Sequence, residues 1–106
     1  MKEITAEGIR ETCDALTAAA RAFPSLYVSV DIDVVDPAFA PGTGYAEPGG
    51  LTASEILYVI ERVAKLSNRV ACDIVEVNPR LDTTHITSKM AARILTTLAT
   101  AAPHQA

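Results

Sequence analysis

The sequence has no tryptophan, and phenylalanine and tyrosine together make up only 5% of its 106 residues. It also has no basic excess, because 9 lysines and arginines stand against 13 aspartates and glutamates. Without a basic stripe or interleaved aromatic residues, we expect no nucleic-acid partner. No apolar run reaches the roughly 18 residues of a membrane-spanning helix. No basic amphipathic helix is predicted, so we expect no membrane partner either.

Cysteine is scarce too, and Cys13 and Cys72 fall in different predicted elements. Two such thiols fit a reduced cytoplasmic protein better than a disulfide framework. The first residues contain no apolar stretch typical of a signal peptide, which favours the same compartment. Hydrophobic residues still make up 49% of the chain. That content is ample for the core of one domain.

The hydrophobic pattern alternates between helical and strand spacing. The predicted elements are a helix capped by Thr5 and ending before Phe23, a strand over 26–34, a helix from the capping box Thr52–Glu55 to about Leu66, a strand over 69–77, and a helix capped by Thr84, His85 or Thr87 that reaches about Thr100. A helical crossover between the two strands makes them parallel, with a right-handed connection. The predicted fold class is α/β, in the order αβαβα.

Two parallel strands do not form a stable sheet by themselves. Parallel sheets are normally covered on both faces and contain more strands. Both predicted strands are also apolar along most of their length, as interior strands are. We therefore expect the chain to form a homo-oligomer or to be complemented by a further part of a larger protein.

Two aspartates interrupt the first predicted strand. Asp31 and Asp33 stand two residues apart, and side chains at this spacing in a strand share one face. Two adjacent carboxylates are costly to bury unless a cation compensates them. A segment rich in proline and glycine, 37–50, follows at the strand exit, where α/β sheets bind ligands. One interpretation is a divalent metal site, and the other is an edge strand with two solvated acids.

Glu76 lies near the end of the second predicted strand. If the strands are parallel neighbours, Glu76 emerges beside Asp31 and Asp33, and we call these three residues the acidic rim. Such a cluster suits a metal, a cationic substrate or both, whereas Glu76 taken alone is more typical of a solvated strand end. We interpret Asp73 as structural, hydrogen-bonded to loop backbone, and Asp36 as a turn former before proline.

The residue pattern gives little support for phosphate binding, an EF-hand calcium site or nucleophilic catalysis. The glycines of Pro41–Gly44 come without the lysine of a phosphate-binding loop, and the spacing of Asp31, Asp33 and Asp36 does not fit an EF-hand. No local serine, cysteine and histidine pattern indicates nucleophilic catalysis. We therefore assign no catalytic residue in this chain.

The segment Ser29–Gly44, followed by Gly49–Thr52, closely resembles the signature of the arginase/agmatinase (ureohydrolase) family. Asp73–Pro79 resembles the same family's second carboxyl-terminal motif. The resemblance extends over roughly residues 4–101. The residues Pro41–Gly44 resemble the agmatinase sequence more than that of arginases proper.

This resemblance implies a three-layer α/β/α fold and a binuclear manganese hydrolase that releases urea from a guanidino substrate. By motif position, it implies that Asp31 and Asp33 are manganese ligands, with Asp31 bridging the ions. It implies that Glu76 orients the substrate guanidinium. Paired manganese ions lower the pKa of water, and a carboxylate suits a planar cation. Agmatine, arginine, guanidinobutyrate and formimino-glutamate all stay open as substrates.

The sequence also departs from the family. It lacks the Gly-Gly-Asp-His and Asp-Ala-His-x-Asp motifs that supply the other metal ligands, and Tyr45-Ala46 stands where Thr-Pro is usual. The resemblance therefore corresponds to about the last third of a ureohydrolase. We expect residues 1–106 to be that carboxyl-terminal portion, and to be inactive alone. The alternatives are a non-catalytic, self-associating remnant and a weak metal or polyamine binder.

Overall fold

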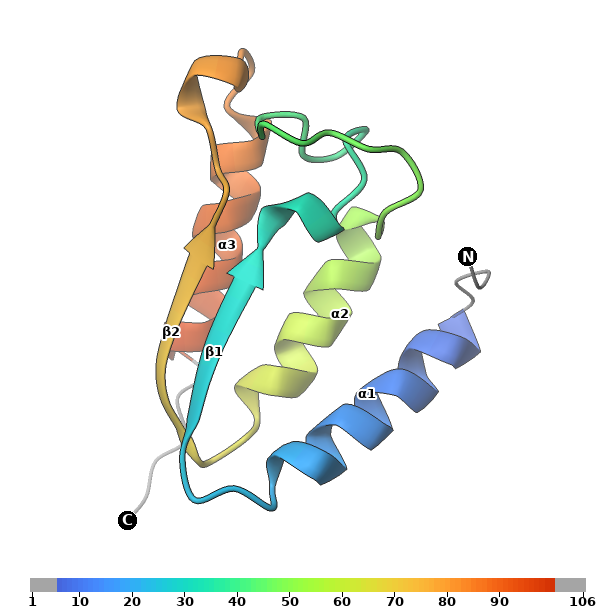
Figure 1. Cartoon of the computed structure of the whole chain (residues 1–106), viewed down its shortest axis with the longest axis vertical. Coiled ribbons are helices and arrows are strands. Elements are labelled where there is room, and N and C mark those ends of the chain that lie inside the picture. Colours follow the sequence, from blue (N-terminus) through green and yellow to red (C-terminus); the bar gives the residue numbers. More distant parts are fainter. Residues whose placement is uncertain (1–5, 101–106) are drawn as a thin grey trace.

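The structure is a computed structural model that describes residues 6–100 (Figure 1). Its elements are α1 (Ala6–Ala20), β1 (Leu26–Asp31), the 3-10 turn η1 (Ile32–Val34), α2 (Ala53–Ala64), β2 (Arg69–Val75), the 3-10 turn η2 (Pro79–Leu81) and α3 (Ile86–Thr100). The predicted αβαβα order is confirmed, as is the capping box of Thr52 and Glu55. Thr5, the predicted first cap, lies outside the described residues.

Both strands end earlier than predicted. β1 stops at Asp31, because the Asp31 carboxylate accepts the N–H of Asp33 and caps η1. β2 stops at Val75, because Glu76 has a φ of 72°, which is incompatible with a strand. The predicted strands over 26–34 and 69–77 are therefore wrong in their last residues.

β1 and β2 pair in parallel, with α2 as the crossover between them. Alternate residues of each strand face the helices, and Val28 and Val30 join the core there. The opposite face carries Tyr27, whose exposed fraction is 62%, and Val75, whose exposed fraction is 39%. Among residues 6–100, nothing covers this second face.

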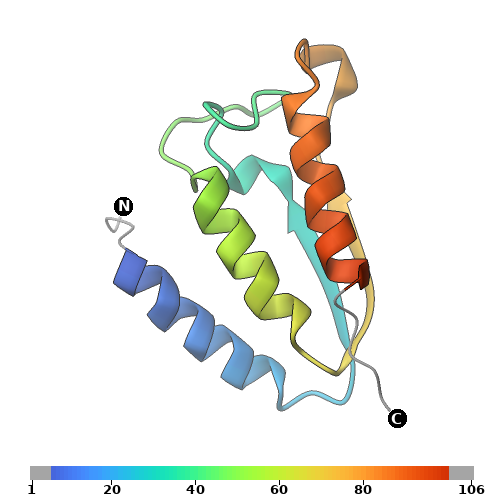
Figure 2. The ribbon, with the colours of Figure 1, turned by 180° about the vertical axis from the view of Figure 1, so that it is seen from behind.

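All three helices lie on the same side of the sheet (Figure 2). α2 and α3 pack together against the strands, whereas α1 lies beside α2 and not over the sheet. The large side chains of the buried core include Ile32, Val35, Ile56, Ile60, Ile94 and Leu98. The described residues thus form two layers of the predicted α/β/α arrangement.

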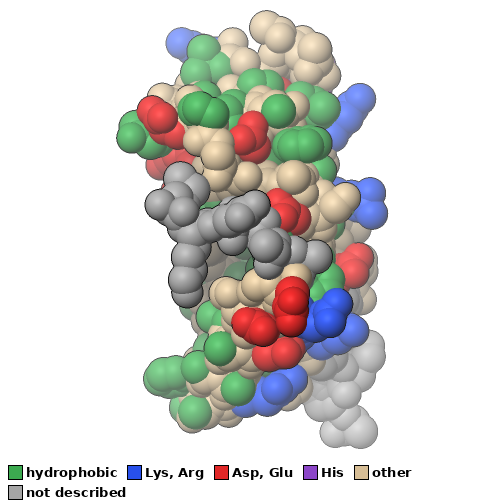
Figure 3. All heavy atoms as spheres, turned by 90° about the vertical axis from the view of Figure 1, so that its right-hand side faces the viewer, with side chains coloured by type: hydrophobic (Ala, Val, Ile, Leu, Met, Phe, Trp, Pro, Cys, Tyr) green, Lys and Arg blue, Asp and Glu red, His purple; other side chains and the backbone are tan. Residues whose placement is uncertain are grey.

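The outward side of α1 carries charges of both signs (Figure 3). Glu7, Arg10 and Glu11 are exposed there, and Asp14 forms an ion pair of 2.6 Å with Arg62 of α2. A mixed surface of this kind is typical of a solvated helix face. Within residues 6–100, no helix is both long and apolar enough to cross a membrane.

Arg69, the first residue of β2, fixes the start of this strand to two helices. Its guanidinium donates to the carbonyl of Ala64, the last residue of α2, and to that of Leu98 in the last turn of α3, both at 2.8 Å. The last carbonyls of a helix have no intrahelical partner and carry partial negative charge. A planar cation with several donors satisfies both helix ends together.

We predict that Arg69→Met lowers the free energy of unfolding by about 2–3 kcal/mol, because two charge-assisted hydrogen bonds are lost and two carbonyls lose their donor. Arg69→Lys, with a single ammonium, recovers only part of this loss. Arg93→Met, at an exposed position of α3, is the control and changes stability by less than about 0.5 kcal/mol. Urea unfolding measures all three, and equal losses at positions 69 and 93 would contradict the assigned role.

Candidate metal and substrate site

The acidic rim lies where the two strands end. Asp31 is the last residue of β1, Asp33 lies in η1, and Glu76 follows β2 directly. Asp31 pairs with Val75 in the sheet, so Glu76 is one residue beyond the position opposite Asp31. Figure 1 shows the two arrowheads side by side, both pointing toward the loop between η1 and α2. Parallel pairing thus brings the three carboxylate residues to one edge.

Strand alternation is not what places Asp31 and Asp33 together, and that part of the prediction is wrong. Asp33 lies beyond the strand, and the 3-10 turn orients it. The Oδ1 of Asp31 accepts the N–H of Asp33 at 2.9 Å, and the Oδ1 of Asp33 accepts the hydroxyl of Thr43. Among residues 6–100, neither Oδ2 has a hydrogen-bond donor. One oxygen of each carboxylate is therefore available to a cation.

Glu76 occupies the left-handed region of backbone space, with a φ of 72°. Residues other than glycine rarely adopt this conformation, and it persists where the surrounding structure enforces it, often at functional sites. The side chain is exposed, and no hydrogen bond within the described residues occupies its carboxylate. Glu76 is thus fixed in its backbone and open to a ligand at its side chain.

Asp36 folds the loop that follows η1. Its Oδ1 accepts the N–H of Ala38 at 2.9 Å, and its Oδ2 accepts those of Gly49 and Gly50 at 2.8 and 3.2 Å. These amide donors, that of Ala38 foremost, hold the pKa of Asp36 below its ordinary value. The predicted turn role of Asp36 is confirmed. The same carboxylate also joins the two ends of the loop.

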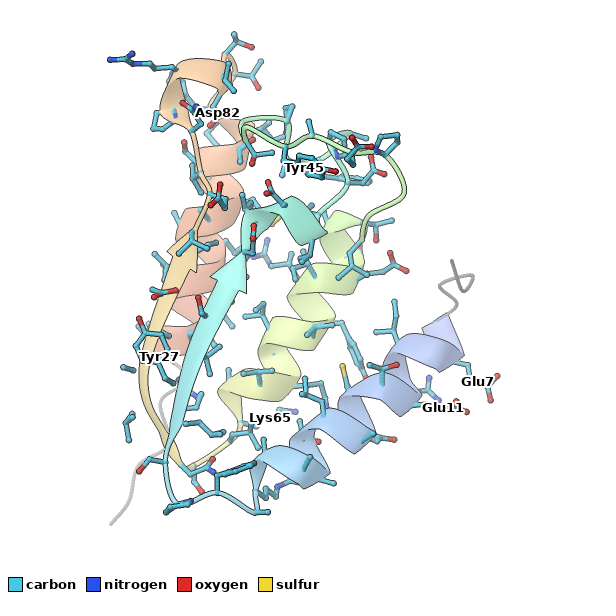
Figure 4. All side chains as sticks on the ribbon, viewed as in Figure 1. Glu7, Glu11, Tyr27, Tyr45, Lys65 and Asp82 are labelled. Atoms are coloured by element: carbon cyan, nitrogen blue, oxygen red, sulfur yellow. The ribbon has the colours of Figure 1, made fainter. Side chains whose placement is uncertain are left out.

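Asp73 has a structural role, but with different partners from those predicted. It accepts a hydrogen bond of 2.6 Å from the hydroxyl of Ser29, its register partner in β1, and another from the hydroxyl of Tyr27. The bond from Ser29, then that from Tyr27, lowers the pKa of Asp73. The expected loop-backbone partner is therefore wrong. These bonds link the two strands on the uncovered face of the sheet, where Figure 4 shows Tyr27.

Asp82, which no sequence pattern singled out, is buried just before α3 (Figure 4). Its carboxylate accepts the N–H groups of Thr87 and Ser88 at 3.0 and 2.8 Å and the Ser88 hydroxyl at 2.7 Å. Burial raises the pKa of Asp82, but the donors from Ser88 and Thr87 outweigh it and bring this pKa to about 2. Asp82 therefore receives the first amides of α3, in place of the predicted Thr84, His85 or Thr87.

The aspartates of the rim fit a hard divalent cation such as manganese, which prefers carboxylate oxygens. Within residues 6–100, however, no three histidine, cysteine or acidic side chains are grouped so that they could hold a metal ion. Asp31 and Asp33 can therefore contribute to a metal site but cannot complete one. The remaining ligands would have to come from another part of a complete protein.

Residues 1–100 match the Arginase family. This chain belongs to the arginase family. It is 54% identical over 69 residues to proclavaminate amidinohydrolase from Streptomyces clavuligerus, covering 65% of this chain and 22% of that protein. It is 44% identical over 72 residues to the agmatinase of Halalkalibacterium halodurans, covering 67% of this chain and 25% of that protein. The family predicted from the sequence is confirmed.

The fold comparison agrees. The chain superposes on the crystal structure of formimidoylglutamase from Bacillus subtilis with a TM-score of 0.82 and 32% sequence identity, over 92% of this chain and 32% of that one. The predicted arginase-like α/β fold is therefore confirmed. The chain spans between 22% and 32% of the length of these three relatives.

The packing of the loop between η1 and α2 can be tested with a matched pair of glycine substitutions. A Cβ on Gly50 would lie 2.7 Å from the backbone nitrogen of Asp36 and 2.8 Å from the carbonyl of Val34, whereas one on Gly44 would meet no heavy atom within 4 Å. We predict that Gly50→Ala costs about 1–3 kcal/mol of stability, because backbone must move. Gly44→Ala changes stability by less than about 0.5 kcal/mol. Denaturant unfolding compares the two variants, and equal stabilities would contradict the described loop closure.

Proposed function

We propose that this chain supplies the carboxyl-terminal part of the active site of an agmatinase-like ureohydrolase, which hydrolyses a guanidino C–N bond and releases urea. The observation that carries the proposal is the gathering of Asp31, Asp33 and Glu76 at one edge in an arginase-family chain. The names of the relatives, an amidinohydrolase and an agmatinase, support a substrate with an amidine or guanidine group.

Asp31 and Asp33 would hold manganese through the oxygens that accept no hydrogen bond within the described residues. When bound, paired manganese ions lower the pKa of water and polarise the substrate. The hydrogen bonds at the two Oδ1 atoms restrict the carboxylates before any ion arrives. This preorganisation reduces the ordering cost of binding.

Glu76 would bind the substrate guanidinium. A carboxylate can accept two parallel hydrogen bonds from this planar cation, which fixes both its position and its orientation. The left-handed backbone at Glu76 limits how the side chain can leave the rim. The role of Glu76 is therefore to orient the substrate and not to hold the metal.

The chain alone would be inactive. It offers two metal-binding carboxylates, whereas affinity for a divalent ion grows with the number of ligands. The matched part of the chain covers only 22% to 32% of the length of its relatives. The missing ligands would come from a segment that corresponds to the rest of such a relative. That segment would pack against the uncovered face of the sheet.

A chimera tests this function. Residues 1–100 replace the matching segment of the agmatinase from Halalkalibacterium halodurans, and urea release and bound manganese are both measured. In the active chimera, Glu76→Gln lowers kcat/KM for agmatine roughly a hundredfold, equivalent to about 3 kcal/mol of transition-state stabilisation, with manganese content retained. Asp33→Asn does the reverse and loses manganese first.

Asp14→Asn is the matched carboxylate control, because Asp14 pairs with Arg62 on the helical side of the molecule. It leaves both manganese content and turnover unchanged within about twofold, as a surface ion pair contributes little. Parallel losses of metal and turnover in Glu76→Gln would refute its substrate role. A folded, manganese-loaded chimera that releases no urea from agmatine, arginine or guanidinobutyrate would refute the proposed function.

The uncovered sheet face favours a second candidate, a non-catalytic module that associates with itself. Tyr27 and Val75 leave apolar surface exposed on this face, and exposed apolar patches often mark interfaces. Under this function, the isolated chain sediments as a dimer or larger species, and Tyr27→Asp shifts it toward monomer. Leu95→Asp, at an exposed position of α3, does not. A monodisperse monomer at high concentration would exclude this candidate.

A further inference from the structure

The loop between η1 and α2 is in direct contact with the start of α3. The N–H of Gly42 donates to the hydroxyl of Thr87 at 2.7 Å, and the carbonyl of Gly42 accepts the N–H of Asn78 at 2.8 Å. A Cβ on Gly42 would lie 2.6 Å from that of Asp82 and 2.9 Å from the Thr87 hydroxyl. The side chains of Asp82 and Thr87 therefore leave no room for a side chain at position 42.

Two hydrogen bonds hold Thr87 in place. Thr87 is fully buried; its N–H donates to the carboxylate of Asp82, and its hydroxyl accepts from Gly42. Asp82 is 1% exposed and accepts two further bonds from Ser88. Buried polar groups that are fully paired resist displacement, because breaking any one bond leaves a desolvated partner. The start of α3 thus forms a rigid support for the loop.

Thr43 follows Gly42 directly, so the contacts that hold Gly42 also hold the backbone of Thr43 next to the acidic rim. Thr43 is 4% exposed, and its hydroxyl donates to the Oδ1 of Asp33. A hydroxyl has a single proton, so donating it to Asp33 sets the orientation of both side chains. The second oxygen of Asp33, which has no hydrogen-bond donor among residues 6–100, is then held in a defined orientation.

We propose that Thr43 is a positioning residue for Asp33. Thr43 is held in turn through the contacts of Gly42 with Thr87 and Asp82. Thr87 belongs to α3, which begins 53 residues after Asp33, and Asp82 lies just before that helix. The consequence for metal binding rests on the proposed function, but the positioning of the carboxylate does not. Residues that orient a metal ligand commonly change metal affinity by about 10- to 100-fold when they are replaced.

The first test needs no metal. In the isotope-labelled 106-residue chain, three-bond NMR couplings report the χ1 rotamers of Asp33. We expect one rotamer in the unmodified chain and in Thr43→Ser, which keeps the hydroxyl, and averaging over several rotamers in Thr43→Val. Thr97→Val is the matched control, because the Thr97 hydroxyl bonds only to the carbonyl of Arg93 on α3.

The same measurement tests the support. Thr87→Val removes the acceptor for Gly42 and should release Asp33 as Thr43→Val does, whereas Thr87→Ser should not. Circular dichroism verifies that each variant is folded. The double variant Thr43→Val/Thr87→Val should show no more averaging than either single variant, because both act along one path. A single Asp33 rotamer in folded Thr43→Val would overturn the proposal.

Manganese titration of the same samples separates this proposal from the proposed function. Line broadening of the amides at 31–33 gives the affinity of the rim for Mn²⁺, which we expect to fall roughly tenfold in Thr43→Val and to stay within about twofold in Thr43→Ser. Binding that is unchanged in Asp33→Ala would refute the metal role of the rim. The rotamer result would still decide whether Thr43 positions Asp33.

Discussion

The hydrogen bond from the Asp33 amide to the Asp31 carboxylate is the constraint on which the acidic rim depends. It ends β1, begins η1, and turns a strand into a corner at the edge of the sheet. Without that corner, Asp33 would continue along the strand and its hydroxyl donor from the loop would be out of reach. The side chain that ends the strand is itself one of the proposed metal ligands, so a local backbone choice and the chemistry of the site coincide at Asp31.

Hydrogen-bond satisfaction separates the acids of this chain into two classes. Asp36 and Asp82 each accept three hydrogen bonds, and Asp73 accepts two, so their negative charge is already compensated within the fold. The acidic rim is different, because each member keeps at least one oxygen without a donor among residues 6–100. Charge that the fold compensates serves structure, and charge that it leaves open attracts a cation. Because exposed acids such as Glu7 and Glu11 on α1 are open as well, it is the placement of open carboxylates together at the strand ends that favours a ligand at the rim.

The element order, the parallel pairing and the common edge of the rim follow from short-range patterns, and the sequence was sufficient to predict them. The strand ends were not predictable in the same way. β-branched residues recur up to Val34 and Val77, but the Asp31 carboxylate and the left-handed Glu76 override that propensity. Asp82 was missed because it caps α3 from four residues before the helix begins, outside the usual N-cap spacing, and because its contact with Gly42, 40 residues earlier, is visible only in the folded chain. Sequence periodicity reports which face is buried and carries no information about such long-range polar contacts.

The sheet and the ligand set are incomplete in different ways, and the difference bears on how a complete site would form. The sheet has an uncovered face, so its completion needs apolar surface from elsewhere. The orientation of Asp33, in contrast, is set entirely within this chain, through Thr43 and the start of α3. A partner segment would therefore meet carboxylates that are already ordered, and its binding energy would not be spent on arranging them. Under the proposed function, this internal order at the rim would let the remaining ligands join a carboxylate that is already oriented, whereas a structural remnant would gain nothing from it.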